Sequence, residues 1–147
     1  MAGMRISQCV LITICLLSPP LLAQTPSSES LQPVATMKQL MLEIIHPSSN
    51  DIQFAANRAP TTDQEWAALK RSAMILAESG NLLIMRNRAG DWVSESRALI
   101  DVGSAAYKAA ESRDPSALGA LAGRLDASCT SCHRKFRPAL FDPDPRR

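Results

Sequence analysis

Two cysteines and a histidine lie close together near the C-terminal end of the chain, in the run Cys129-Thr130-Ser131-Cys132-His133. Residues three and four positions apart share one face of a helix, so a helix here presents both thiols and the imidazole to the same side. This spacing is typical of covalent haem attachment, in which both sulfurs bind one edge of the haem and the histidine binds its iron. The motif therefore predicts one covalent haem c, with Cys129 and Cys132 as thioether positions and His133 as the proximal axial ligand.

Three other interpretations of the motif were weighed. A thioredoxin-like redox pair uses the same cysteine spacing, but it belongs next to a βαβ pattern, which this sequence lacks. A structural zinc site needs four ligands. Outside the motif, His46 is the only Cys or His that remains once the predicted signal peptide is removed. Chance occurrence is disfavoured because the motif coincides with an export signal and leaves no stray thiol.

The N-terminal segment has the order of a secretory signal peptide. Met1–Arg5 carries one positive charge, Ile6–Leu17 is mostly apolar, and a small residue, Ala23, precedes the expected cleavage point. We therefore predict a signal peptide over 1–23 and a periplasmic location. Cleavage would remove Cys9 and Cys15; a retained N-terminal anchor and lipidation at Cys15 are the alternatives, and the apolar stretch is short for a membrane span.

Composition and charge exclude several kinds of function. The formal net charge is +2, and removal of the signal peptide with its Arg5 lowers it to about +1. A balance so close to neutral gives no support to nucleic-acid binding. Paired carboxylates, a nucleophile beside a histidine, and a phosphate-binding glycine loop do not stand out, so no enzymatic activity is predicted.

Apolar residues recur at three- and four-residue intervals over four segments, which predicts helices. The first begins near Val34 and is expected to end at His46-Pro47, because the residue before a proline is disfavoured in a helix. A cap-like run then precedes a short turn over 52–57. The later helices are expected to begin at Thr62, Asp91 and Asp114, and the last is expected to end before Pro138.

These segments predict an all-α protein, an antiparallel four-helix bundle that encloses the covalently bound haem. The expected domain organisation is a flexible leader over 24–32, a four-helix domain over 33–137 and a disordered tail over 138–147. Trp66 and Trp92 fall on apolar helix faces and are expected in the core.

Between about Val34 and Arg137 the chain resembles the class II c-type cytochromes, the family of cytochrome c′ and its low-spin relatives such as cytochrome c-556. The most specific element is the haem motif at the end of the last helix, followed by an aromatic residue, Phe136, and then a basic one, Arg137. The resemblance implies a four-helix bundle, a role for Arg137 beside a haem propionate, and redox proteins as partners. Members often pair through their first two helices, so a homodimer is one expectation, although no exposed apolar stripe in this sequence selects it.

The resemblance leaves the sixth position of the iron to be assigned. Low-spin members of the family place a methionine of the first helix there, and the match selects Met41, with Met37 as second choice and His46 as third. Methionine ligation implies a low-spin one-electron carrier. In the five-coordinate members an apolar side chain occupies this position, which implies a binding protein for nitric oxide or carbon monoxide. Core packing is the alternative role for both methionines.

Overall fold

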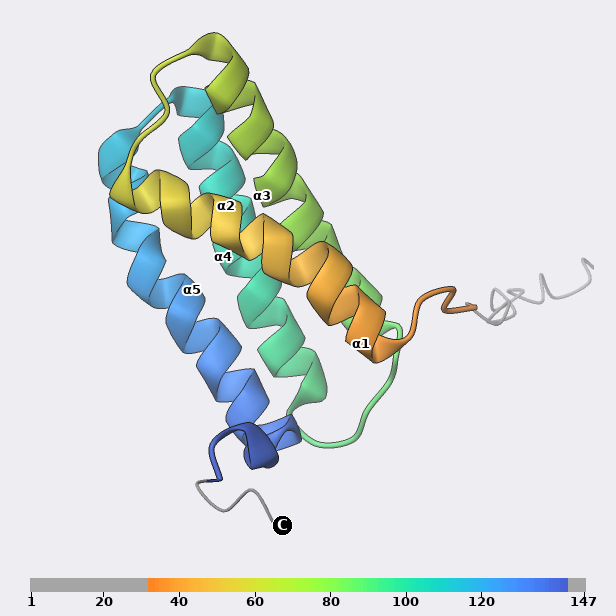
Figure 1. Ribbon diagram of the computed structural model, residues 1–147. Coiled ribbons are helices and arrows are strands. Elements are labelled where there is room, and N and C mark those ends of the chain that lie inside the picture. The colour runs from red at the N-terminus through yellow and green to blue at the C-terminus, as the bar shows by residue number, and fades with distance from the viewer. Residues whose placement is uncertain (1–31, 143–147) are drawn as a thin grey trace, which may run out of the picture. The chain divides into compact units, whose positions relative to one another are not determined.

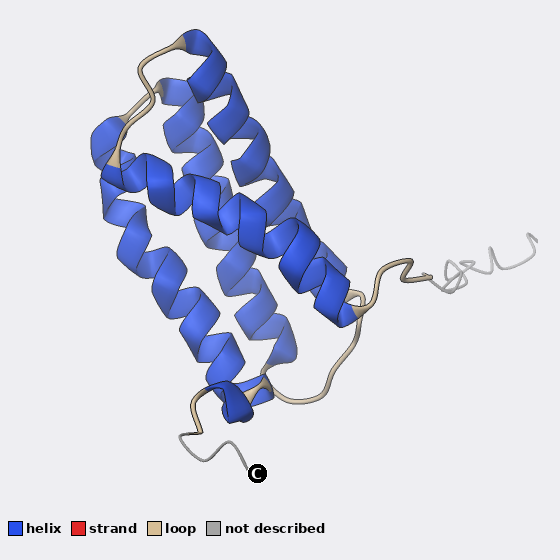
Figure 2. Ribbon diagram, in the orientation of Figure 1, coloured by secondary structure: helices blue, strands red, loops and turns tan. Residues whose placement is uncertain are grey.

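The structure is a computed structural model that describes residues 32–142. The predicted signal peptide, nearly all of the predicted leader and the last five residues lie outside this range. Every regular element in the described range is helical (Figure 2). The elements are α1 (Met37–Gln39), the π-helix η1 (Leu40–Ile45), α2 (His46–Asn57), α3 (Asp63–Ile84), α4 (Trp92–Ser112), α5 (Pro115–Phe136) and the 3-10 helix η2 (Pro138–Leu140).

The elements α1, η1 and α2 follow one another without a break and form the first of four long helices (Figure 1). The α3–α4 pair shares the most extensive interface, α4 packs next against α5, and α2 lies across α3 and α5. Successive helices run in opposite directions. The predicted all-α fold of four antiparallel helices is thus confirmed. No helix among the described residues is long and apolar enough to cross a membrane.

The predicted end of the first helix at His46-Pro47 is wrong, because the helix continues to Asn57. The turn before Pro47 is wound as a π-helix, in which the His46 N–H donates to the Met41 carbonyl. Pro47 lies inside this continuous helix, directly after the π-helical turn. The wider turn relieves the clash that a proline ring makes with the carbonyl four residues earlier in a regular α-helix. Ser48, expected in a cap, instead donates its hydroxyl to the Ile44 carbonyl at 2.8 Å.

Two of the three predicted helix starts carry the expected side-chain caps. Thr62 accepts from the Glu65 N–H at 3.2 Å, and the Glu65 carboxylate accepts from the Thr62 N–H at 3.1 Å. Asp114 accepts from the N–H groups of Ser116 and Ala117. Asp91 stands at the N-cap of α4, but its side chain does not bond to that helix.

The capping box at the start of α3 makes stability depend on acid pH. Hydrogen bonds from the backbone and hydroxyl of Thr61, and then from Thr62, lower the pKa of Glu65 from 4.5 to about 2. A lowered folded-state pKa means that the ionised carboxylate stabilises the fold above about pH 4.5 and loses this effect as the pH falls towards 2. Glu65→Gln keeps a hydrogen-bond acceptor but cannot ionise. We therefore expect its free energy of unfolding, measured with urea, to fall less than that of the wild type as the pH falls from about 4.5 towards 2. Equal pH slopes for the two proteins would contradict this assignment.

The two tryptophans are buried as predicted, Trp66 in α3 and Trp92 at the start of α4. The Trp92 indole N–H donates to the Leu83 carbonyl at 2.6 Å, which ties the end of α3 to α4. Phe136 packs edge-on against the Trp92 ring, with centroids 4.9 Å apart. These contacts hold the last turn of α5 against α4.

Glycine allows α3 and α4 to approach closely. A Cβ added at Gly103 would lie 2.6 Å from the Ala77 amide nitrogen and 2.9 Å from its Cα, and backbone cannot yield as a flexible side chain would. We expect Gly103→Ala to destabilise the protein by about 1–3 kcal/mol, the usual cost of overpacking. The matched control is Gly123→Ala in α5, where no atom lies within 4 Å of the added Cβ.

At Gly123 the better helix propensity of alanine should stabilise the fold by about 1 kcal/mol. Chemical unfolding of both variants measures the contrast. Equal effects at the two positions would show that α3 and α4 are not in tight contact at Gly103.

Candidate functional site

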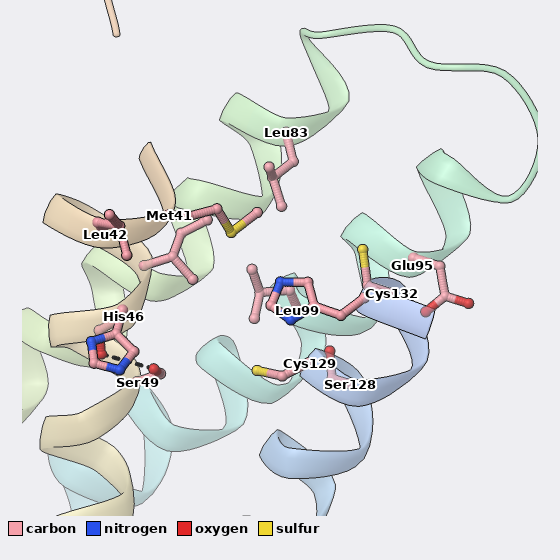
Figure 3. Close-up of a pocket in the computed structure, with 12 residues that line it drawn as sticks. Met41, Leu42, His46, Ser49, Leu83, Glu95, Leu99, Ser128, Cys129 and Cys132 are labelled. Carbon is pink, nitrogen blue, oxygen red and sulfur yellow. Dashed lines mark hydrogen bonds between the residues drawn. The ribbon is translucent and has the colours of Figure 1, made fainter. Parts of the chain in front are cut away.

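A cavity of about 210 Å³ lies between the first helix and α5, and its wall is overwhelmingly apolar (Figure 3). All four long helices contribute to it. The lining residues are Met41, Leu42, Ile45, His46 and Ser49 from η1 and α2, Leu83 from α3, Glu95 and Leu99 from α4, and Ser128, Cys129, Cys132 and His133 from α5.

All three chemically active residues of the sequence motif line this cavity. Cys129 and Cys132 are half-buried free thiols one helical turn apart on α5. Burial raises the pKa of both thiols, with smaller contributions from Asp126 at Cys129 and from Glu95 at Cys132. Both are therefore held as neutral thiols at neutral pH.

His133 lies next to Cys132 in the last turn of α5. Burial lowers the pKa of its imidazole, and the positive charge of Arg137 lowers it further. A neutral imidazole is the form that binds a metal ion. Among the described residues, no group of three His, Cys, Asp or Glu side chains is arranged to hold a metal ion.

The first helix places Met41 in the wall facing α5, and its sulfur points into the cavity (Figure 3). Met37 packs against the core one turn earlier and does not line the cavity. His46 lines the cavity on the same helix, but its residue is exposed and its Nδ1 lies 3.4 Å from the Asn50 amide nitrogen. Of the three residues weighed as sixth ligand, Met41 and His46 thus reach the cavity.

Arg137 follows the end of α5 and is exposed. Its backbone N–H donates to the His133 carbonyl at 2.7 Å, and its side chain is not part of the cavity wall. The proposed role beside a propionate stays a prediction.

Glu95 in α4 was not recognised as a site residue from the sequence. Its carboxylate is buried, and Oε1 lies 2.6 Å from the Lys135 Nζ and accepts from the Ser131 hydroxyl at 3.0 Å. Lys135 also pairs with Asp91 at 2.8 Å, which explains why Asp91 does not cap its own helix. A signal was present, since Glu95 lies three residues after Trp92 and four before Leu99, on the apolar stripe of α4.

The pairs with Asp91 and Glu95 raise the pKa of Lys135, and the Lys135 pair lowers the pKa of Asp91. Lys135 thus links α5 to α4 beside the cavity.

Comparisons of the chain with models of known protein families, with curated proteins and with solved structures find no match.

Proposed function

We propose that this chain is an exported class II c-type cytochrome that carries single electrons in the periplasm. One observation carries the proposal: Cys129, Cys132 and His133 line one wall of an apolar cavity, and Met41 lines the facing wall. A redox-active iron held between these walls would have ligands from two different helices.

The residues of the cavity fit haem c. The apolar wall suits a porphyrin, and cysteines one turn apart suit two vinyl groups on one ring edge. Attachment is an addition: each S–H adds across a vinyl double bond, so that sulfur binds one carbon, hydrogen the other, and nothing is released. When bound, haem supplies an iron that exchanges one electron between its ferric and ferrous states.

The side chains divide the remaining tasks. His133 would bind the iron from α5, and burial lowers the pKa of its imidazole, which favours the neutral form that binds a metal. Met41 is the proposed sixth ligand, and its thioether would raise the reduction potential relative to a second nitrogen ligand. Leu83 and Leu99 add apolar surface to the cavity wall, and an apolar surrounding tunes the reduction potential of a bound iron. Redox proteins are the proposed partners.

The test is the optical spectrum of the purified mature protein. We expect the haem to stay attached after denaturation and to give the pyridine haemochrome spectrum of thioether-linked haem. The folded ferric protein should have a low-spin spectrum with the weak far-red band of iron–methionine bonding. Absence of covalent haem would refute the cytochrome assignment. Covalent haem with a high-spin spectrum would refute the carrier and leave a five-coordinate binding protein for nitric oxide or carbon monoxide.

A further inference from the structure

Glu95 is the one carboxylate among the residues that line the cavity. Its side chain is only 9% exposed and comes from the first turn of α4, on the apolar stripe of that helix. Burial of an unpaired carboxylate costs free energy, so a buried carboxylate needs hydrogen-bond or ion-pair partners. Glu95 and Ser128 also border a second, more open groove on the outer side of the α4–α5 seam. The carboxylate thus separates an apolar interior from a polar surface groove.

Two donors from α5 bind this carboxylate. The Lys135 ammonium lies 2.6 Å from Oε1, and the Ser131 hydroxyl donates to the same oxygen at 3.0 Å. Ser131 is one of the two residues between the haem-attaching cysteines. The haem motif therefore holds Glu95 through its own spacer, across 36 positions of sequence.

The two partners of the ion pair differ in their relation to the cavity. Glu95 lines the cavity, whereas Lys135 does not, and the Lys135 side chain is 45% exposed. The second carboxylate on Lys135, from Asp91, is 64% exposed. Water screens exposed charges much more than buried ones, so the buried Glu95 carboxylate acts on the cavity more strongly than the exposed Asp91 carboxylate does.

We propose that Glu95, held by Ser131 and Lys135, sets the reduction potential of the site by stabilising the ferric over the ferrous state. The inference rests on the proposed haem site. A fixed negative charge beside iron favours the more positive oxidation state and thereby lowers the potential. Glu95 thus opposes the rise that a methionine ligand brings. It is a positioning residue that acts through the field in the cavity and binds no iron itself.

The test is a redox titration of the haem-loaded protein and of Glu95→Gln. Glutamine keeps the volume and can still accept from Lys135 and Ser131, so the change removes the charge and little else. We expect a higher midpoint potential with an unchanged low-spin spectrum. The matched control is Asp91→Asn, which removes an exposed charge from the same network and should raise the potential less.

The salt dependence of the midpoint potential further distinguishes Glu95→Gln from Asp91→Asn. Between about 0.01 M and about 1 M salt the screening length falls from about 30 Å to about 3 Å. The Glu95→Gln shift should persist at high salt, and the Asp91→Asn shift should disappear. An unchanged or lower potential in folded Glu95→Gln, or a shift that salt abolishes, would overturn the proposal.

A second variant keeps the proposal testable if Glu95→Gln does not fold. Ser131→Ala removes a donor that partly neutralises the carboxylate, so the potential should fall, opposite in sign to Glu95→Gln. Thr130→Val, at the other spacer position, is the control and should leave the potential unchanged. An unchanged potential in Ser131→Ala would overturn the proposal. Haem content is measured in each protein, so a missing haem refutes the cytochrome assignment, whereas full haem with no shift refutes only the role of Glu95.

Discussion

Replacement of both Cys129 and Cys132 by alanine is expected to abolish covalent haem attachment completely. The two thiols line the cavity side of α5 and, among the described residues, are the only cysteines. Without them no thiol remains in the cavity wall to form a thioether with haem, although His133 is retained. Each single variant should keep one bond, and its haem should be attached less efficiently.

The measurement is the mass of the purified protein after expression in a host with haem-attachment machinery, together with haem staining of a denaturing gel. Cys9→Ala with Cys15→Ala is the matched control, since both cysteines lie in the predicted signal peptide. This control should be fully loaded if it is exported. Covalent haem in the Cys129→Ala, Cys132→Ala protein would refute the assignment of the motif.

Met41→Ala is expected to convert the ferric protein from low spin to high spin and to remove the far-red band. The Met41 sulfur points into the cavity from the first helix, whereas Cys129 and Cys132 line the cavity from α5. Removal of Met41 would therefore leave one side of a bound iron without a protein ligand. Loss of the thioether should also lower the reduction potential, because methionine ligation stabilises the ferrous state. Optical and spin-state spectra of the wild type and the variant measure the first effect, and a redox titration measures the second.

Three variants control for packing and for rival ligands. Met41→Leu keeps nearly the same volume and cannot bind iron, so it should resemble Met41→Ala in spin state while preserving stability. Met37→Ala and His46→Ala should leave the spectrum low-spin. If Met41→Ala stays low-spin while His46→Ala turns high-spin, then His46, which also lines the cavity, is the ligand.

Helical periodicity alone could not select the sixth ligand among Met37, Met41 and His46. Met37 and Met41 are four residues apart, so periodicity assigns them to the same face of an ideal helix. The π-helical turn over Leu40–Ile45 changes the rotation of the residues along this helix. Met41 and His46 line the cavity, whereas Met37 packs on the core. The π-helical turn could not be predicted from the local sequence. The residue before a proline is disfavoured in a helix, so His46-Pro47 predicted that the helix ends there.

Features that depend on neighbours a few residues apart could be predicted from the sequence. The capping box of Thr62 and Glu65, the cap of Asp114 and the shared face of Cys129 and Cys132 all rest on bonds or spacings within one helical turn. Such interactions form wherever the local backbone is helical, so their residue types can be recognised without a fold.

Contacts between groups on different helices could not be predicted from the sequence. Ser131 and Glu95, 36 positions apart, share a hydrogen bond, and Lys135 bridges Asp91 and Glu95 from another helix. The cavity itself exists only where α5 faces the first helix. These contacts depend on the rotation and separation of packed helices, which are set by the fit of many side chains together and by the close approach at Gly103. No single segment of sequence carries that information.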